Sequence, residues 1–380
     1  MTNKELDLKL LEELCSAFGP SGHEHEAQKI ARDYGKKYAD EVLYDRMGSV
    51  VFRKGDKGPK IMLAGHVDEI GFVITQIDKN GFLRFHQLGG FWDQVLLAQE
   101  VLIKASKSDK KIVGIISAPP PHVLSAEARK KVVTKEKMFI DIGASSKEEV
   151  KDLGIRVGDP AVPVSQFRTM KRIRKEKKDE DDKDAKEETR EVTLVAAKAF
   201  DDRIGVFMGL EILRRISEGK VEHPNTVYFV STTQEEIGLR GARTSAQMLL
   251  PDIGFALEVG ISGDVPGVEG LVQKMGKGVA ISAGDGSMIP NPKFRRFVLD
   301  IAEEIGVQHQ PAFLRSGGTD AGIIHITGIG APSLVIGVPT RHIHSHHGIL
   351  DLSDVEDAVR LMVEVIERLD EKTVASFTEL

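Results

Sequence analysis

The stretch that decides the fold reads Lys60-Ile61-Met62-Leu63-Ala64-Gly65-His66-Val67-Asp68. A short apolar run that leads directly into polar residues is typical of a strand buried inside an α/β sheet. Side chains two apart lie on the same face of a strand, so His66 and Asp68 can serve one site. Imidazole is a good zinc ligand, and a neighbouring carboxylate can fix its orientation. The stretch therefore predicts a buried strand with a metal ligand at its end.

Two further segments place acidic pairs after apolar runs. Asp201-Asp202 follow residues 195–200, and Glu235-Glu236 follow residues 228–232. Each pair has a simpler reading, because an aspartate can cap a helix and acids are favoured at a helix N-terminus. If the three segments converge, however, one carboxylate can bridge two ions about 3.5–4 Å apart. Together they favour a two-metal hydrolase over a single-metal site.

A histidine-rich segment follows another apolar run near the C-terminus. Residues 341–347 read Arg-His-Ile-His-Ser-His-His and come after the run at 334–338. A solvated tract is one interpretation. Open α/β sheets, however, form their sites at the carboxyl edge of the strands. The position therefore predicts that at least one histidine joins the other three segments.

The order of predicted elements indicates two parts. Strands and helices alternate before residue 70 and again after about residue 190, which is typical of a mainly parallel sheet covered by helices on both faces. Residues 71–77 and 82–85 form a predicted hairpin around Asn80-Gly81, and short strands continue to about residue 168. We expect residues 1–70 with 169–380 to form an α/β domain, interrupted by a β-rich domain at 71–168.

Residues 171–191 are almost entirely Lys, Arg, Asp and Glu. Such a segment cannot bury a hydrophobic core, so its composition predicts a solvated, flexible loop, with an interaction tail as the alternative.

Composition narrows the function classes. The chain has 380 residues, 41% of them hydrophobic, and a formal net charge of -6, which gives no support for binding nucleic acid or an anionic membrane. Cys15 is the only cysteine, so neither an intrachain disulfide nor a cysteine-based zinc site is available. No window has the roughly 18 uninterrupted apolar residues of a membrane span, and no signal region is evident at the start. We expect a soluble cytoplasmic protein.

Several motifs, taken in order along the chain, carry a family resemblance. They are Gly65-His66-Val67-Asp68, Phe200-Asp201-Asp202-Arg203, Gln234-Glu235-Glu236, Gly318-Thr319-Asp320-Ala321 and Ile343-His344-Ser345. They resemble the tetrahedral aminopeptidases, also known as glutamyl or deblocking aminopeptidases, which are two-metal peptidases often labelled endoglucanases. The likeness runs from about residue 8 to 368.

The resemblance implies a zinc-exopeptidase-like α/β domain with an inserted, β-barrel-like domain used in assembly. Two divalent ions are implied in each subunit, zinc or cobalt first and manganese as a further candidate. Asp201 would bridge the ions. The remaining ligands would be His66 and Glu258 for one ion and Glu236 and His344 for the other. The implied partners are peptide substrates and other copies of the chain, up to a dodecamer.

The same resemblance assigns the proton chemistry. Glu235 would be the general base that takes a proton from a metal-activated water, while Asp68 would support His66. One ion would bind the free α-amine of the substrate, which restricts cleavage to the N-terminus.

The chain departs from the family pattern at a few positions. Glu258 stands where the family usually has Asp, which keeps the carboxylate but lengthens the side chain by one methylene. Near His344, the family's usual Tyr, Pro and Glu are replaced by His342, His346 and Gly348. These last changes concern the substrate pocket more than the ligands.

Two other functions compete with peptide hydrolysis. A glycan hydrolase would agree with the endoglucanase label, but such enzymes normally use two carboxylates without metals. A non-catalytic metal-binding assembly protein would explain Glu258 as drift, although Glu235 and Asp68 are both retained. Glycan cleavage that survives chelation would favour the first, and metal content without hydrolysis the second.

Overall fold

The structure, a computed structural model, describes residues 5–177 and 187–379. Its helices are α1 (Leu8–Ser16), α2 (His25–Gly35), α3 (Lys147–Asp152), α4 (Phe200–Gly219), α5 (Arg240–Leu249), α6 (Pro292–Glu304), α7 (Asp320–His325), α8 (Leu352–Arg368) and α9 (Glu371–Ser376). Short 3₁₀ turns are η1 (Asp93–Val95), η2 (Pro121–Val123), η3 (Ala128–Lys130) and η4 (Lys135–Lys137). Within the described ranges, no helix is both long and apolar enough to cross a bilayer.

The first strands are β1 (Glu41–Tyr44), β2 (Val50–Lys54), β3 (Lys60–His66), β4 (Gly71–Ile77), β5 (Leu83–Leu88), β6 (Glu100–Ala105), β7 (Lys110–Ser117), β8 (Phe139–Asp141) and β9 (Pro160–Pro163). The later ones are β10 (Arg168–Lys177), β11 (Glu187–Ala197), β12 (Thr226–Thr232), β13 (Ile253–Ile261), β14 (Val279–Ser282), β15 (His309–Ala312), β16 (Ser333–Thr340) and β17 (Gly348–Asp351).

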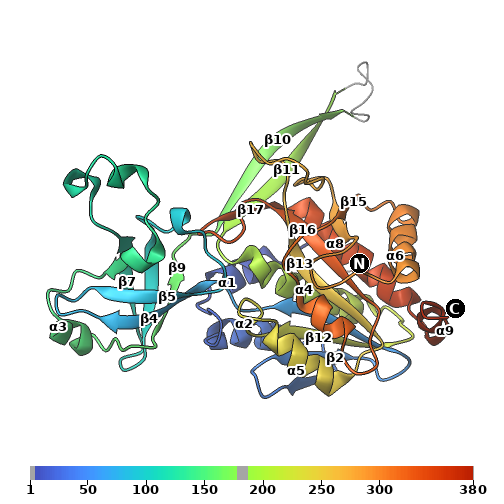
Figure 1. The fold of residues 1–380 in the computed structure, drawn as a ribbon. Helices are drawn as coiled ribbons and strands as arrows, with labels where there is room; N and C mark the ends of the chain where they lie inside the picture. Colours follow the sequence, from blue (N-terminus) through green and yellow to red (C-terminus); the bar gives the residue numbers. More distant parts are fainter. Residues whose placement is uncertain (1–4, 178–186, 380) are drawn as a thin grey trace.

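A mixed eight-stranded sheet forms the centre of the larger part (Figure 1). Its order is β1-β2-β12-β3-β13-β16-β14-β15. The four central strands β12, β3, β13 and β16 are parallel, whereas β2 and β14 run antiparallel to their inner neighbours. The carboxyl ends of the central strands therefore meet at one edge. The predicted class, an α/β fold with a mainly parallel mixed sheet flanked by helices, is confirmed.

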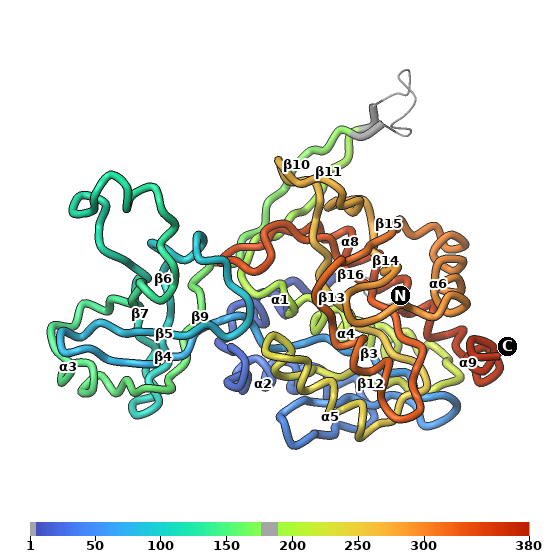
Figure 2. The backbone as a smooth tube through the Cα atoms, in the orientation of Figure 1, coloured from blue at the N-terminus to red at the C-terminus, as the bar shows by residue number. Residues whose placement is uncertain are grey.

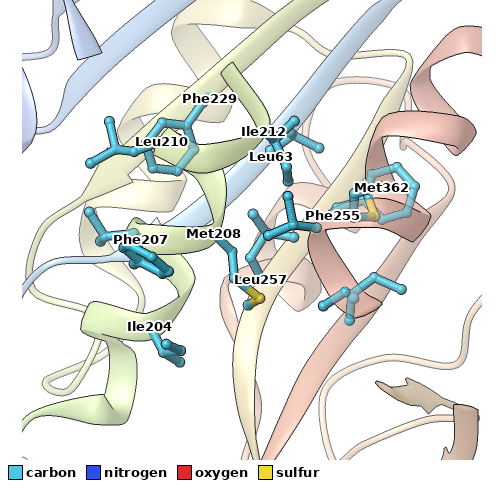
Figure 3. Close-up of a cluster of buried hydrophobic side chains, with 14 of the residues drawn as sticks. Leu63, Ile204, Phe207, Met208, Leu210, Ile212, Phe229, Phe255, Leu257 and Met362 are labelled. Atoms are coloured by element: carbon cyan, nitrogen blue, oxygen red, sulfur yellow. The ribbon is translucent and has the colours of Figure 1, made fainter. Parts of the chain in front are cut away.

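Helices cover both faces because the buried strands are apolar on both. In β3, Ile61 and Leu63 belong to the large core that includes α4 and α8, while Met62 and Ala64 pack with residues of α5 and α7. Figure 3 shows the first of these cores, where side chains from α4 meet those of the central strands. The continuous apolar run of β3 thus follows from burial on two sides.

The inserted segment closes into a barrel of strand order β4-β5-β8-β7-β6-β9. It has a core of its own, which includes Phe72, Ile103 and Ile140. The expected hairpin is present as β4 and β5, with Gly81 at a positive φ of 91° between them. In Figure 2 the barrel lies to one side of the larger part, so the backbone forms two lobes.

The loop prediction for residues 171–191 is wrong in its outer parts. Residues 168–177 and 187–197 pair as the antiparallel ribbon β10–β11, which projects from the larger part (Figure 1). The prediction considered only the missing core, whereas two paired strands satisfy each other's backbone groups without one. Cross-strand charges add support, since Lys171 Nζ lies 3.0 Å from a Glu191 carboxylate oxygen. The middle of the run, 178–186, lies outside the described residues.

Helix α4 approaches the sheet closely enough that glycine is required at the contact. A Cβ atom on Gly65 in β3 would lie 2.5 Å from the carbonyl carbon of Gly205 in α4. A Cβ on Gly205 would lie 2.0 Å from the carbonyl oxygen of Leu257 in β13 and 2.3 Å from Asp202 Oδ2. This contact sets the distance between the start of α4 and the end of β3.

We predict that Gly205→Ala lowers the free energy of unfolding by about 3 kcal/mol, because the added methyl group meets backbone atoms that cannot move aside. Denaturant unfolding followed by circular dichroism measures the change. Gly219→Ala, at the other end of α4, is the control, since its Cβ would meet only one methyl group of Val221, at 3.2 Å, and no backbone atom. Equal stability of the two variants would contradict the close-contact argument.

Candidate metal centre

The predicted site residues gather at the carboxyl edge of the central strands. His66 ends β3, Glu258 lies on β13, and Asp201 begins α4. Glu235 and Glu236 follow β12, and His344 follows β16. A cavity of about 720 Å³ is lined by six of the seven predicted residues, namely His66, Asp201, Glu235, Glu236, Glu258 and His344.

Backbone carbonyls orient both imidazoles. His66 Nδ1 lies 3.1 Å from the carbonyl oxygen of Asp68, and His344 Nδ1 lies 2.6 Å from that of Gly90. A carbonyl only accepts, so each Nδ1 carries the proton and donates it. Each Nε2 is then the nitrogen turned toward Asp201, and it is the one that an ion would bind once its proton is displaced.

Asp201 lies between the two imidazoles. Its Oδ1 is 3.1 Å from His66 Nε2, and its Oδ2 is 3.1 Å from His344 Nε2. One carboxylate thus presents a separate oxygen to each ring. The adjacent Asp202 is used differently, because its two oxygens accept the backbone N–H groups of His66 and Gly205, each at 3.0 Å. The peptide bond between the two aspartates is cis.

Asp68 is fully buried and fastens three segments together. Its Oδ2 accepts hydrogen bonds from Ser21 Oγ at 2.6 Å and from the N–H of Glu236 at 3.2 Å. Its Oδ1 accepts the N–H of Glu235 at 3.0 Å and lies 3.5 Å from His66 Nδ1. These partners hold the pKa of Asp68 below its usual value despite burial, which alone would raise it. Asp68 does not line the cavity, but it fixes the positions of His66 and of the backbone at Glu235 and Glu236.

The cluster carries more negative charge than its own histidines balance. Burial, followed by the charge of Asp201, raises the pKa of Glu236 to about 8. Burial also raises the pKa of Glu235 and Glu258 well above the usual value. At His344, burial lowers the pKa, but Asp201 more than offsets this and brings it to about 10. Such a site holds protons that divalent cations would replace.

The donor set fits divalent metal ions. Ligand atoms of His66, Asp201 and Glu236 lie within 4.8 Å of one another, as do those of His66, Asp202 and Glu258. Glu236 Oε1 is buried and has no hydrogen-bond partner. A buried carboxylate oxygen without a partner is costly unless a cation or donor meets it. Imidazole and carboxylate are ligands that zinc and similar ions accept.

Comparison with known proteins identifies the family. Residues 48–361 match the M42 glutamyl aminopeptidase family. The chain belongs to this family. It is 34% identical over 376 residues to the putative aminopeptidase FrvX of Escherichia coli (strain K12), covering 98% of this chain and 99% of that protein. It is 31% identical over 369 residues to a lysyl aminopeptidase of Pyrococcus furiosus, covering 96% and 98%. The sequence resemblance is confirmed, and the chain is an aminopeptidase.

Solved structures of similar fold include aminopeptidases of the same kind. A TET aminopeptidase from the marine sediment archaeon Thaumarchaeota archaeon SCGC AB-539-E09 is 46% identical, with a TM-score of 0.90 over 98% of this chain and 99% of that one. The TET1 peptidase of Pyrococcus horikoshii is 30% identical, with a TM-score of 0.79 over 95% and 99%. An endoglucanase from Thermotoga maritima is 25% identical, with a TM-score of 0.72 over 97% and 99%, so the endoglucanase label does occur among similar structures. Membership of a metallopeptidase family implies use of divalent metal.

A buried ion-pair network of Glu69, Lys198 and Arg203 lies next to the aminopeptidase site. Lys198 Nζ lies 2.5 Å from one oxygen of Glu69 and also donates to the carbonyl of Ala17. The fully buried Arg203 donates to the carbonyls of Val67 and Gly19 and lies 3.4 Å from Glu69. Glu69 follows Asp68 in sequence, and Arg203 is two residues from Asp201. The ion pairs of Glu69 therefore tie the backbone beside Asp68 to the backbone beside Asp201.

Sequence reasoning assigned no role to two further acids beside the enzyme's site. Asp320 Oδ2 accepts from Thr232 Oγ1 at 2.5 Å, and its charge helps to raise the pKa of Glu235. Glu24 Oε1 accepts the N–H groups of Gly22 and Gln234. Asp320 lies in one of the motifs quoted above, but the hydroxyl of Thr232 that it accepts and the N–H of Gln234 that Glu24 accepts are distant in sequence.

We predict that Lys198→Met lowers the free energy of unfolding by about 3–5 kcal/mol, because the buried Glu69 loses its shorter ion pair and keeps only Arg203, 3.4 Å away. Thermal and denaturant unfolding measure the loss. Lys36→Met is the matched control: it breaks the exposed Lys36–Asp33 pair and should change stability far less. A loss no larger than that of the control would show that the buried pair does not stabilise the enzyme.

Proposed function

We propose that this aminopeptidase removes N-terminal residues from peptides with two divalent ions per subunit and Glu235 as the general base. His66 and Glu258 would hold one ion, Glu236 and His344 the other, and Asp201 both. The observation that carries the proposal is the position of Asp201, with one oxygen facing each imidazole at 3.1 Å. A carboxylate that binds a single ion would need only one imidazole near it. Two imidazoles, each facing a different oxygen of Asp201, favour two ions with Asp201 between them.

When bound, such ions lower the pKa of water and polarise the scissile carbonyl. The chain's own contribution at this step is Glu235. It lines the cavity, its side chain is 12% exposed, and its Oε2 lies 3.7 Å from His66 Nε2. The hydrogen bond from its N–H to Asp68 fixes its backbone. Glu235 can therefore accept a proton from water and deliver it to the leaving amine.

The ion identities follow from the donors. Two imidazoles with carboxylates suit zinc or cobalt, and the large oxygen share also suits manganese. Glu258, in place of the family's usual Asp, is 5% exposed and lines the same cavity, so the longer side chain still reaches the site. This supports its proposed role as a ligand.

We further propose that residues 71–168 form the inserted assembly domain and that the remainder, 1–70 and 169–380, forms the peptidase domain. The separate barrel core supports the boundary. The Pyrococcus horikoshii relative is described as assembling into a tetrahedron or a large octahedral shell, and a further similar structure, PhTET1-12s, as a dodecamer. Both support a homo-oligomer here, up to a dodecamer. A single buried cysteine agrees with a cytoplasmic location.

Glycan hydrolysis is the weaker candidate. A glycosidase needs one carboxylic acid and one carboxylate on opposite sides of a sugar ring. The two imidazoles whose Nε2 atoms face Asp201 would have no part in that chemistry. The non-catalytic alternative leaves Glu235, which faces the cavity without being needed as a ligand, unexplained.

We predict that Glu235→Gln lowers kcat for aminoacyl p-nitroanilides by about 10³-fold, because the amide cannot accept the proton. Metal content, measured by mass spectrometry, should remain that of the wild type. Glu12→Gln, an exposed change of the same kind, is the control. Retained turnover in the Glu235 variant would refute its role as base, and glycan cleavage that survives chelation would revive the alternative.

We predict two ions per wild-type subunit, about one in His344→Ala, and fewer than one in Asp201→Asn, since only Asp201 would serve both ions. Mass spectrometry of dialysed protein gives these ratios. His122→Ala, which removes an exposed histidine of the barrel, should keep both ions. A wild-type ratio of one would contradict the two-metal proposal.

A further inference from the structure

The segment that carries Glu235 belongs to neither a helix nor a strand. Residues 233–239 connect β12 to α5, so the hydrogen bonds of a regular element do not fix their backbone. Gln234, directly before the proposed base, has a φ of +54°. A residue with a Cβ atom keeps this left-handed conformation only where its surroundings hold it. The path of the chain into Glu235 therefore depends on the groups that hold Gln234.

The backbone N–H of Gln234 is held by a buried carboxylate, that of Glu24. Oε1 of Glu24 accepts this N–H at 3.2 Å and the N–H of Gly22 at 2.7 Å. Among the described residues, no second acceptor meets the N–H of Gln234. Glu24 is 7% exposed and is the N-cap residue of α2, yet its side chain makes no capping hydrogen bond to that helix. The side chain reaches the segment after β12 instead.

Asp68 accepts the next two N–H groups, those of the two glutamates that follow Gln234. Three consecutive N–H groups after β12 therefore end on two buried carboxylates. Asp68 also lies 3.5 Å from His66 Nδ1, so its loss would disturb a proposed metal ligand directly. The hydrogen bonds of Glu24 go to Gly22 and Gln234, neither of which is a proposed ligand. Glu24 can thus be changed without removing a hydrogen bond to a ligand.

We propose that Glu24 is a positioning residue for peptide hydrolysis: it holds Gln234 in the left-handed conformation and thereby sets the place of the Glu235 carboxylate. The inference rests on the proposed function, in which Glu235 is the general base. A base must lie within hydrogen-bond reach of the water that it deprotonates, and small displacements of a catalytic group cost much of the rate. Glu24 does not line the cavity, so it acts through the backbone alone.

The first test removes the acceptor. Glu24→Met should lower kcat for aminoacyl p-nitroanilides about tenfold and leave KM within about twofold, the pattern of a contact that matters for the transition state and not for substrate binding. Metal content should remain that of the wild type. Glu24→Gln keeps an oxygen that can accept the N–H, so its kcat should stay near that of the wild type. An unchanged kcat in Glu24→Met, or an equal loss in Glu24→Gln, would overturn the proposal.

The second test asks whether the effect passes through the conformation of Gln234. Glycine adopts a positive φ without steric cost, so it depends less on being held. The loss of kcat caused by Glu24→Met should therefore shrink from about tenfold to less than about threefold when both proteins also carry Gln234→Gly. A purely structural role of Glu24 predicts the same loss in both backgrounds, and that result would contradict the proposal.

Gln28→Met is the matched control for stability. Gln28 lies on α2, is 8% exposed, and donates from Nε2 to the carbonyl of Ser231 in β12 at 2.8 Å. This variant also removes a buried hydrogen bond between the start of the chain and β12, but not one that reaches Gln234. It should lower stability in denaturant unfolding and keep kcat. A loss of kcat as large as that of Glu24→Met would attribute the effect to any weakened contact there, and the proposal would fail.

Failure here differs from failure of the proposed function. If folded, metal-loaded wild-type protein cleaves no p-nitroanilide, or if Glu235→Gln keeps full turnover, the proposed chemistry fails and the role of Glu24 falls with it. If Glu235→Gln is inactive while Glu24→Met cleaves as the wild type does, the chemistry stands and only the role of Glu24 is lost.

Discussion

The buried carboxylate of Asp68 is the constraint on which the rest of the site depends. It receives the hydroxyl of Ser21 from the N-terminal loop and the N–H groups of Glu235 and Glu236 from the segment after β12. Three stretches of chain far apart in sequence are thereby fixed around one group that lies beside His66. Its burial is tolerable because each oxygen accepts a hydrogen bond, so the side chains proposed as metal ligands are held by a carboxylate that does not itself line the cavity.

Much of the fold and of the candidate ligand set could be predicted, because parallel strands that end in polar residues must deliver them to one edge. Periodicity and strand-end chemistry sufficed to predict that His66, Asp201 and the Glu235–Glu236 pair come together, and all of them line one cavity. They did not suffice for Glu258, which came from the family pattern, because a single acid inside an apolar strand has no local signal.

The remaining differences have physical causes of their own. The ribbon β10–β11 was missed because composition reports on cores and not on strand pairing. Glu24 and Asp320 were assigned no role because hydrogen-bond partners are brought close only by the folded chain: the N–H of Gln234 and the hydroxyl of Thr232 that they accept come from another segment.

The carbonyl of Gly90 that orients His344 belongs to the loop between β5 and β6, and both of those strands are in the barrel. A Cβ on the adjacent Gly89 would lie 2.8 Å from Glu236 Oε2. The insertion is therefore part of the wall of the hydrolytic centre as well as a separate lobe. A chain trimmed to the α/β half would therefore lose the contact that fixes the tautomer of His344.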